Sequence, residues 1–421
     1  MLHFAINTRL IVFLLMFAYV SAISIEAIYN HEPISSEAAS ITEVDQEYHL
    51  VILFSSFVCL IAFSAGYSFS WLSKLEKVVP SRKKRAAYKR SNFNYFLLGY
   101  WVFLAGIGWL VFRNEFYISF LSYSDNVEIS YNNSTFSFYK TILYSYSAIT
   151  AALLVYTRFY IPAILLCAFL FWMGVETSDK DPIVLSILSL GSSNALYNRR
   201  ISLGLLTFIA ASFVLLLFFS KVYSFYRGAE TVPRSIERAY EEFSFMELDG
   251  SGPYLSIQYV MADDGPLEYG STYLRQLVTL VPKMIYKDRP PDVADLFAQK
   301  TLTHYFGGRG VGYSPIADAY TNFGFIGLPV QFFLQILLFS FVWWVTAMVL
   351  MNLSPIKRTE VVVIYRVIGF YQLLLLLRSP SLFFIKAQIY LLFPLLLGVL
   401  IWALLPKKKK LVAGSKPIAN L

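Results

Sequence analysis

Long apolar runs dominate this chain and constrain its fold more than any other feature. A run of about 17 apolar residues is enough to cross the roughly 30 Å hydrocarbon core of a bilayer as a helix. Hydrophobic residues make up 57% of the 421 residues and charged residues 15%, whereas soluble proteins carry about 25% charged residues. The sequence therefore predicts an all-α polytopic membrane protein with about ten transmembrane helices. The predicted spans are Leu10–Ile28, Leu50–Trp71, Phe93–Phe112, Tyr139–Tyr156, Phe159–Val175, Ile183–Tyr197, Leu203–Ser220, Ile326–Leu350, Val361–Leu377 and Leu382–Leu405.

The distribution of charge predicts how these spans are oriented. The stretch Lys74–Arg90 holds eight basic residues and one acid, and Lys407–Lys410 is a run of four lysines. Short loops rich in Lys and Arg stay on the cytoplasmic side of a membrane, so the net charge of +8 reflects topology rather than a nucleic-acid partner. The acidic loop Asn30–Glu47 suits the opposite side. We therefore expect a bacterial inner-membrane protein with both termini in the cytoplasm.

The span Ile183–Tyr197 is the most polar of the ten. Whether it crosses the membrane decides on which side all later loops lie. If it crosses the membrane, Arg199, Arg200 and the C-terminal lysines all lie in the cytoplasm, as the charge bias requires. The segment between the seventh and eighth spans then forms one large helical periplasmic loop. The predicted organisation is 1–220 with the first seven transmembrane helices, 221–325 as the large periplasmic loop, and 326–421 with the last three helices and a basic cytoplasmic tail.

Two segments of this loop carry apolar residues at helical spacing. The first follows Pro233 and the second precedes Pro282. Amphipathic helices of this kind can lie on the membrane surface over a transmembrane bundle. The apolar positions are Ile236, Tyr240 and Phe243 in the first segment, and Leu274, Leu277, Val278 and Val281 in the second.

A third helix is predicted at the end of the loop. Ser314 followed by Pro315 is typical of an N-cap residue and the first position of a helix. This helix is expected to run to about Asn322 and to stop at Gly324. Asp318 and Asn322 are four residues apart and therefore share one face of it.

Several basic residues of the loop stand beside Pro or Gly and outside obvious helical ion pairs. Lys283, Arg289 and Arg309 are of this kind, and Arg309 lies within the glycine-rich stretch 307–312. Such cations, together with backbone N–H groups, can hold an anionic ligand, although ordinary ion pairs explain them equally well. Arg378 ends the ninth predicted span near the outer boundary, where it either faces a ligand or snorkels to the interface.

The sequence indicates neither a metal nor a cofactor. His304 has no second His or Cys nearby. Cys59 and Cys167 both lie within apolar runs, where neither a disulfide framework nor a metal site is expected.

The stretch from Tyr269 to Gly327 resembles the outer-loop signature of Wzy-type polymerases, which polymerise O-antigen and other oligosaccharide repeat units. The matching elements are Tyr273-Leu274, Pro282-Lys283, Arg289-Pro290, Gly307 to Gly312, and Asp318-Ala319-Tyr320-Thr321-Asn322-Phe323-Gly324 to Gly327. The chain differs from the family pattern in carrying Asp318 where Glu is common and Lys283 where Arg is common.

The resemblance implies a metal-independent, inverting glycosyltransferase at the periplasmic face. The growing glycan would move from undecaprenyl pyrophosphate onto the next lipid-linked repeat unit, so both donor and acceptor are undecaprenyl-pyrophosphate-linked oligosaccharides. The lipid bilayer and a chain-length regulator are the further expected partners. Asp318 is the expected base and Arg309 the expected catalytic cation. The expected substrate-binding residues are Lys283, Arg289, Tyr320, Asn322 and Arg378.

Other interpretations of the same residues stay open. Asp318 can instead cap its helix or pair with Arg309. An O-antigen ligase uses the same donor with another acceptor. A glycolipid transporter or flippase would perform no chemistry, and it predicts internal repeats that the sequence does not display.

Overall fold

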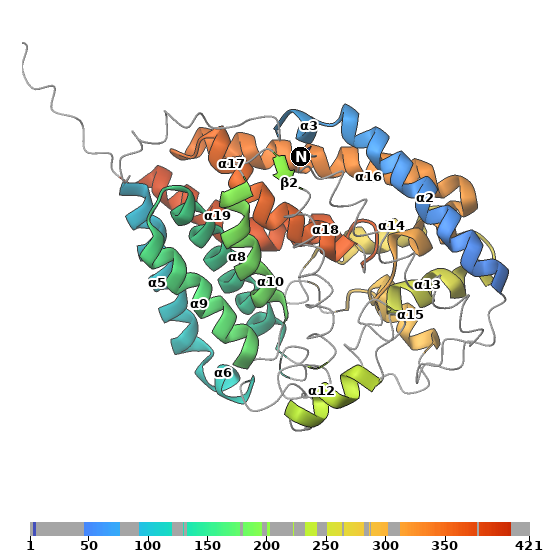
Figure 1. The fold of residues 1–421 in the computed structure, drawn as a ribbon, viewed down its shortest axis with the longest axis horizontal. Coiled ribbons are helices and arrows are strands. Elements are labelled where there is room, and N and C mark those ends of the chain that lie inside the picture. The colour runs from blue at the N-terminus through green and yellow to red at the C-terminus, as the bar shows by residue number, and fades with distance from the viewer. Residues whose placement is uncertain are drawn as a thin grey trace, which may run out of the picture.

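A computed structural model describes residues 3–5, 46–75, 92–119, 129, 133–176, 180–195, 200–202, 222, 232–241, 251–262, 265–281, 286, 288–301, 312–376 and 379–405. These residues are almost entirely helical, which confirms the all-α class (Figure 1). A short antiparallel ribbon joins β1 (His3–Ala5) to β2 (Arg200–Ser202). The helices are α2 (Gln46–Phe69), α3 (Trp71–Leu75), α5 (Asn92–Val111), α6 (Arg113–Ser119), α8 (Ser134–Tyr156), α9 (Tyr160–Glu176), α10 (Lys180–Ala195), α12 (Val232–Glu241), α13 (Ser251–Ala262), α14 (Ser271–Val278), α15 (Val293–Thr301), α16 (Pro315–Leu353), α17 (Arg358–Ile364), the π-helical η1 (Tyr365–Gly369), α18 (Phe370–Leu376) and α19 (Phe383–Leu404).

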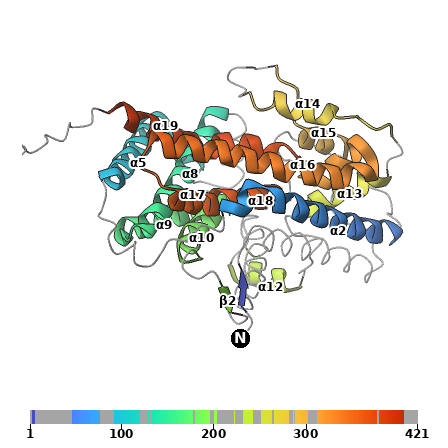
Figure 2. The same cartoon turned by 90° about the horizontal axis from the view of Figure 1, so that it is seen from above.

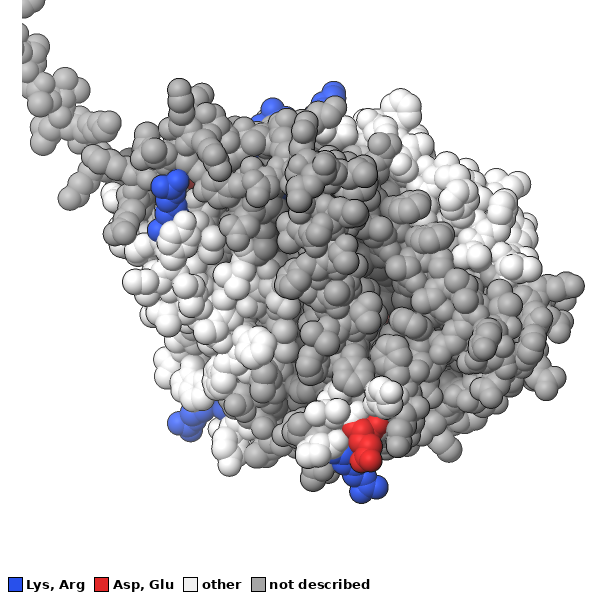
Figure 3. Space-filling view, viewed as in Figure 1, with Lys and Arg blue, Asp and Glu red and all other residues white. Residues whose placement is uncertain are grey.

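Five of the described helices are long and apolar enough to cross a membrane, namely α2, α5, α8, α16 and α19. They fall on the second, third, fourth, eighth and tenth predicted spans. On the face shown in Figure 3, the described charged side chains lie toward the rim. The fold is therefore that of an α-helical membrane protein. The number of spans and the side on which each loop lies stay predictions.

The other five predicted spans have different outcomes. α9 and α10 are apolar but shorter helices at the fifth and sixth predicted spans. The ninth predicted span consists of α17, η1 and α18 in succession. The first and seventh predicted spans lie outside the described residues.

α8 is the most deeply buried of the five long helices, and α5, α9, α10 and α19 pack around it (Figure 1). Two serines of α10, Ser186 and Ser189, are buried against this bundle. Ser189 donates from Oγ to the carbonyl of Ala148 at 3.0 Å, and Ser186 donates to the carbonyl of Cys167 at 3.1 Å. These hydrogen bonds explain how the two serines fit among apolar neighbours, because their hydroxyls bind backbone carbonyls rather than facing hydrocarbon.

α2 runs alongside α16 (Figure 2), where the Phe69 and Phe333 rings meet edge to face at 6.3 Å. α16 begins as predicted, with Ser314 as the N-cap and Pro315 in its first turn. Its helical geometry breaks at Phe323 and Gly324, where Gly324 has φ 59° and ψ −150°. Only glycine adopts that conformation readily. The predicted end of the first helical piece at Gly324 is therefore confirmed.

The break folds the first piece of α16 back against the second. Gln331 donates from Nε2 to the carbonyl of Pro315 at 2.9 Å, although 16 residues separate them. A Cβ on Gly327 would lie 2.5 Å from the carbonyl oxygen of Ala319. Gly324 supplies the turn and Gly327 permits the close approach of the two pieces. The fold of α16 therefore explains why glycine stands at both positions.

Candidate functional site

α14 buries its polar side and exposes its apolar side. Thr272 and Gln276 are only 2% and 4% exposed, whereas Leu274 and Leu277 are 68% and 43% exposed. The apolar stripe predicted on this segment is present, but it does not pack into the protein. What the helix packs against must therefore be polar.

The polar partner is Asp318 of α16, whose side chain is 0% exposed. Its Oδ1 accepts from Thr272 Oγ1 at 2.6 Å and from Asn322 Nδ2 at 3.3 Å. Its Oδ2 accepts from Gln276 Nε2 at 2.8 Å and from the backbone N–H of Ser381 at 3.0 Å. Four donors thus surround a carboxyl group that has no access to water, and these bonds offset its desolvation.

Further side chains extend this arrangement. Asn322 accepts from the backbone N–H of Gly270 at 2.7 Å and donates to Thr272 Oγ1 at 2.5 Å. Gln276 accepts from the backbone N–H of Leu382 at 2.7 Å. Gln331 hydrogen-bonds both Tyr273 and Ser381. We call the set the Asp318 network; its members are Thr272, Tyr273, Gln276, Asp318, Asn322, Gln331 and Ser381.

The Asp318 network joins three segments that are distant in the sequence: α14, the first piece of α16, and the turn that precedes α19. Because every oxygen lone pair of Asp318 faces a protein donor, the observed contacts are those of a positioning residue. Its predicted role as a base stays a prediction.

The turn before α14 is fixed to the end of the first piece of α16. The backbone N–H of Glu268 donates to the carbonyl of Thr321 at 2.9 Å, and that of Tyr269 donates to the carbonyl of Asn322 at 3.2 Å. Tyr269 has φ 44°, an uncommon conformation for a residue with a side chain. Ser271 donates from Oγ to Oε2 of Glu268. The Glu268 side chain is therefore held on a rigid frame.

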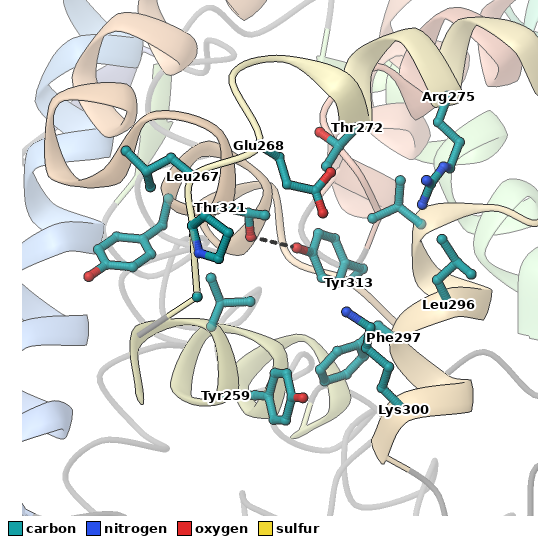
Figure 4. A pocket seen from close by; sticks show the side chains of 15 residues that line it. Tyr259, Leu267, Glu268, Thr272, Arg275, Leu296, Phe297, Lys300, Tyr313 and Thr321 are labelled. Atoms are coloured by element: carbon teal, nitrogen blue, oxygen red, sulfur yellow. Dashed lines mark hydrogen bonds between the residues drawn. The ribbon is translucent and has the colours of Figure 1, made fainter. Parts of the chain in front are cut away.

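A pocket of about 600 Å³ lies beside the network, between α13, α14, α15 and the first piece of α16 (Figure 4). The rings of Tyr259, Phe297 and Tyr313 form one wall, with successive centroids 5.6 Å apart. Glu268 and Lys300 reach toward Tyr313 from opposite sides in Figure 4. The lining residues are Tyr259, Val260, Gly265, Pro266, Leu267, Glu268, Thr272, Arg275, Val293, Leu296, Phe297, Lys300, Tyr313, Tyr320 and Thr321.

Two tyrosines, Tyr273 within the network and Tyr313 beside it, are held as neutral phenols. Burial, and then the negative charge of Asp318, raise the pKa of Tyr313 well above its usual range. The same two causes raise the pKa of Tyr273. Tyr313 shares a hydrogen bond of 2.9 Å with the hydroxyl of Thr321. These phenols therefore serve as hydrogen-bonding groups near neutral pH.

The structure brings together some of the predicted site residues. Asn322 shares a face with Asp318, as predicted, and belongs to the Asp318 network; it is buried, and its predicted substrate contact stays a prediction. Tyr320 lines the pocket, and its ring meets Phe325 edge to face at 5.1 Å. Lys283, Arg309 and Arg378 lie outside the described residues.

Arg289 lies at the C-terminal end of α14, away from the pocket lining. Its Nη1 donates to the carbonyls of Thr279 and Val281 at 2.9 and 3.0 Å. A guanidinium at a helix C-terminus satisfies carbonyls that lack helical partners. In the structure Arg289 thus acts as a cap, and its predicted substrate contact stays a prediction.

Sequence reasoning missed several residues of the site. Thr272 and Gln276 are four apart, on the side of α14 opposite the apolar stripe, and this spacing was a usable signal. Glu268, Arg275 and Lys300 line the pocket from different segments, so no local pattern links them. Among the described residues, no group of three or more His, Cys, Asp and Glu side chains could hold a metal ion.

The fold and the site together define a class: an α-helical membrane protein with a buried polar network beside an open pocket. Comparisons with known proteins do not assign the chain to a family. No protein-family model matches the chain, and neither any curated protein nor any solved structure does.

Proposed function

We propose that this protein is a polysaccharide polymerase of the bacterial inner membrane. It transfers a growing glycan from undecaprenyl pyrophosphate onto the next lipid-linked repeat unit at the periplasmic face. One observation carries the proposal: the two ends of the Wzy-like stretch, at Thr272–Gln276 and Asp318–Gly327, meet in the Asp318 network. About 45 residues lie between Thr272 and Asp318 in the sequence, and the hydrogen bond between them is 2.6 Å long.

The pocket supports the proposal through its chemistry. Its volume of about 600 Å³ lies in the range of sites for small ligands. The rings of Tyr259, Phe297 and Tyr313 suit the apolar faces of sugar rings, while Arg275 and Lys300 suit a pyrophosphate. Thr272 both lines the pocket and donates to Asp318, so the network fixes one wall of this site.

The exposed apolar side of α14 supports a place at the membrane surface. The Tyr273 and Phe323 rings are 6.2 Å apart, which joins α14 to α16 just before its long apolar piece. Phe325 and Ile326 begin that piece and are exposed. An apolar surface continuous from α14 to a membrane-crossing helix fits contact with lipid. A substrate carried on a polyprenyl chain would reach the pocket from the same surface.

In the proposed reaction, an acceptor hydroxyl attacks the anomeric carbon of the donor glycan and the lipid pyrophosphate leaves. Cations that neutralise the departing pyrophosphate lower the barrier. Arg309 and Arg378 are proposed for this task beside Arg275 and Lys300. Arg309 stands four residues before Tyr313 in the sequence, and Arg378 three residues before Ser381.

The proposal is tested by deleting the protein and resolving the cell-surface glycan as a ladder on a gel. A polymerase is expected to leave single repeat units on the lipid core. Absence of any glycan on the core would indicate a ligase or a transporter, and an unchanged ladder would contradict the proposal. Complementation with Arg309→Ala is expected to abolish chain extension, whereas the control Arg234→Ala, an exposed residue of α12, is expected to restore the ladder.

A further inference from the structure

We infer that Glu268, rather than Asp318, is the carboxylate that takes the proton of the acceptor hydroxyl, and that Asp318 is a positioning residue. The inference rests on the proposed function and assigns a catalytic group within it. It depends on the geometry of the pocket and not on the sequence resemblance, whose matched stretch begins one residue after Glu268.

The first step is access. A general base has to come within hydrogen-bonding distance of the proton it removes. Asp318 is 0% exposed and does not line the pocket, and four protein donors occupy its oxygens. Glu268 is exposed and is the one carboxylate among the described residues that line the pocket.

The second step is orientation. Glu268 is held through its backbone by Thr321, and Ser271 donates to its Oε2. Its Oε1 accepts no hydrogen bond from the described residues. One oxygen of this pocket-lining residue therefore has a described partner, and the other is left to accept the proton of a substrate hydroxyl. Asn322 fixes the same turn by accepting from Gly270 at 2.7 Å, and it also donates to the backbone carbonyl of Asp318 at 2.7 Å.

The third step is the separation of charges across the pocket. Arg275 comes from α14 and Lys300 from α15, and Glu268 precedes α14 (Figure 4). The two cations offer a place for the anionic leaving group, and the carboxylate offers a place for the hydroxyl that attacks. Tyr313 also lines the pocket, and its neutral hydroxyl, which shares a hydrogen bond with Thr321, can bind a sugar hydroxyl without taking its proton.

The proposed step is balanced in atoms and electrons. The acceptor oxygen forms a bond to the anomeric carbon of the donor while its proton passes to Glu268. The bond between that carbon and the pyrophosphate oxygen breaks, and its electron pair leaves with the lipid pyrophosphate. Glu268 then returns its proton to solvent at the open mouth of the pocket.

The test uses the full-length protein in proteoliposomes, with the lipid-linked repeat unit extracted from the membranes of the deletion strain as substrate. Glu268→Gln is expected to lower the initial rate of chain extension at least about 100-fold, the scale of general-base catalysis. Its melting temperature and its KM for the repeat unit are expected to stay near those of the wild type. The matched control is Glu237→Gln, an exposed residue of α12, which is expected to keep the wild-type rate.

A further readout separates a base from a structural residue. Added formate is expected to restore part of the rate of Glu268→Ala. A wild-type rate in Glu268→Gln, or a loss of rate that follows a loss of melting temperature, would overturn the assignment. Absence of extension by the wild-type protein itself would overturn the proposed function.

Discussion

Buried polar side chains are used in two different ways in this molecule. In the helical bundle of α8, α9 and α10, hydroxyls such as those of Ser186 and Ser189 donate to backbone carbonyls of a neighbouring helix. In the Asp318 network, side chains bind one another, and Asp318 alone receives four donors from three segments. Each of these bundle bonds joins one hydroxyl to one carbonyl, whereas four bonds of the network share Asp318 as their acceptor.

This contrast predicts which substitutions destabilise the protein most. A serine lost from the bundle leaves a carbonyl that already has its helical partner, so the change stays small. Loss of Asp318 leaves several buried donors without an acceptor at the same time, and each unsatisfied donor is costly. The Asp318 network can therefore hold a site in a fixed geometry, whereas the separate hydroxyl–carbonyl bonds of the bundle cannot.

The largest effect is expected from Asp318→Leu. This change leaves Thr272, Gln276 and the N–H of Ser381 without their acceptor. Because a buried unsatisfied donor costs about 1–3 kcal/mol, the free energy of unfolding is expected to fall by about 3–5 kcal/mol. The melting temperature in detergent measures the loss. Asp288→Leu is the matched control, since Asp288 is exposed, and equal melting temperatures for the two variants would show that the network carries no special stability.

A smaller effect is expected from Gly327→Ala. The added Cβ would lie 2.5 Å from the carbonyl oxygen of Ala319, so the two pieces of α16 have to separate. Overpacking of this kind costs about 1–3 kcal/mol, and chain extension is expected to fall with it because the pocket wall moves. Gly99→Ala provides the comparison, since its Cβ would meet nothing within 4 Å. Similar melting temperatures would mean that the fold of α16 is not rigid.

The smallest effect is expected from Ser189→Ala in the bundle. The hydrogen bonds to Ala148 and Leu185 are lost, but both carbonyls belong to helices. Interhelical hydrogen bonds in membrane proteins are worth about 0.6 kcal/mol on average, so the melting temperature is expected to change little and the rate of chain extension not at all. A loss as large as that of Asp318→Leu would remove the distinction between the two regions.

Several features of the fold could be predicted from the sequence because they depend on local chemistry. Apolar length predicted the five long helices, since a membrane-crossing helix needs a fixed number of apolar residues. Ser314 and Pro315 predicted the start of α16, and Gly324 predicted its break, because caps and left-handed backbone have strong residue preferences. The shared face of Asp318 and Asn322 followed from the helical repeat, and the 2.7 Å bond between Asn322 and the Asp318 carbonyl confirms it.

Local sequence is enough to predict the long helices and the break in α16, because these properties depend on neighbouring residues. Which face of α14 is buried depends instead on contacts between distant segments. Helical periodicity separates an apolar face from a polar one, but it does not say whether the surroundings are water, lipid or a buried carboxyl group. No local pattern connects the segments that meet at the site. Thr272 bonds Asp318 across 46 residues of sequence, and Glu268, Arg275 and Lys300 line one pocket from different segments.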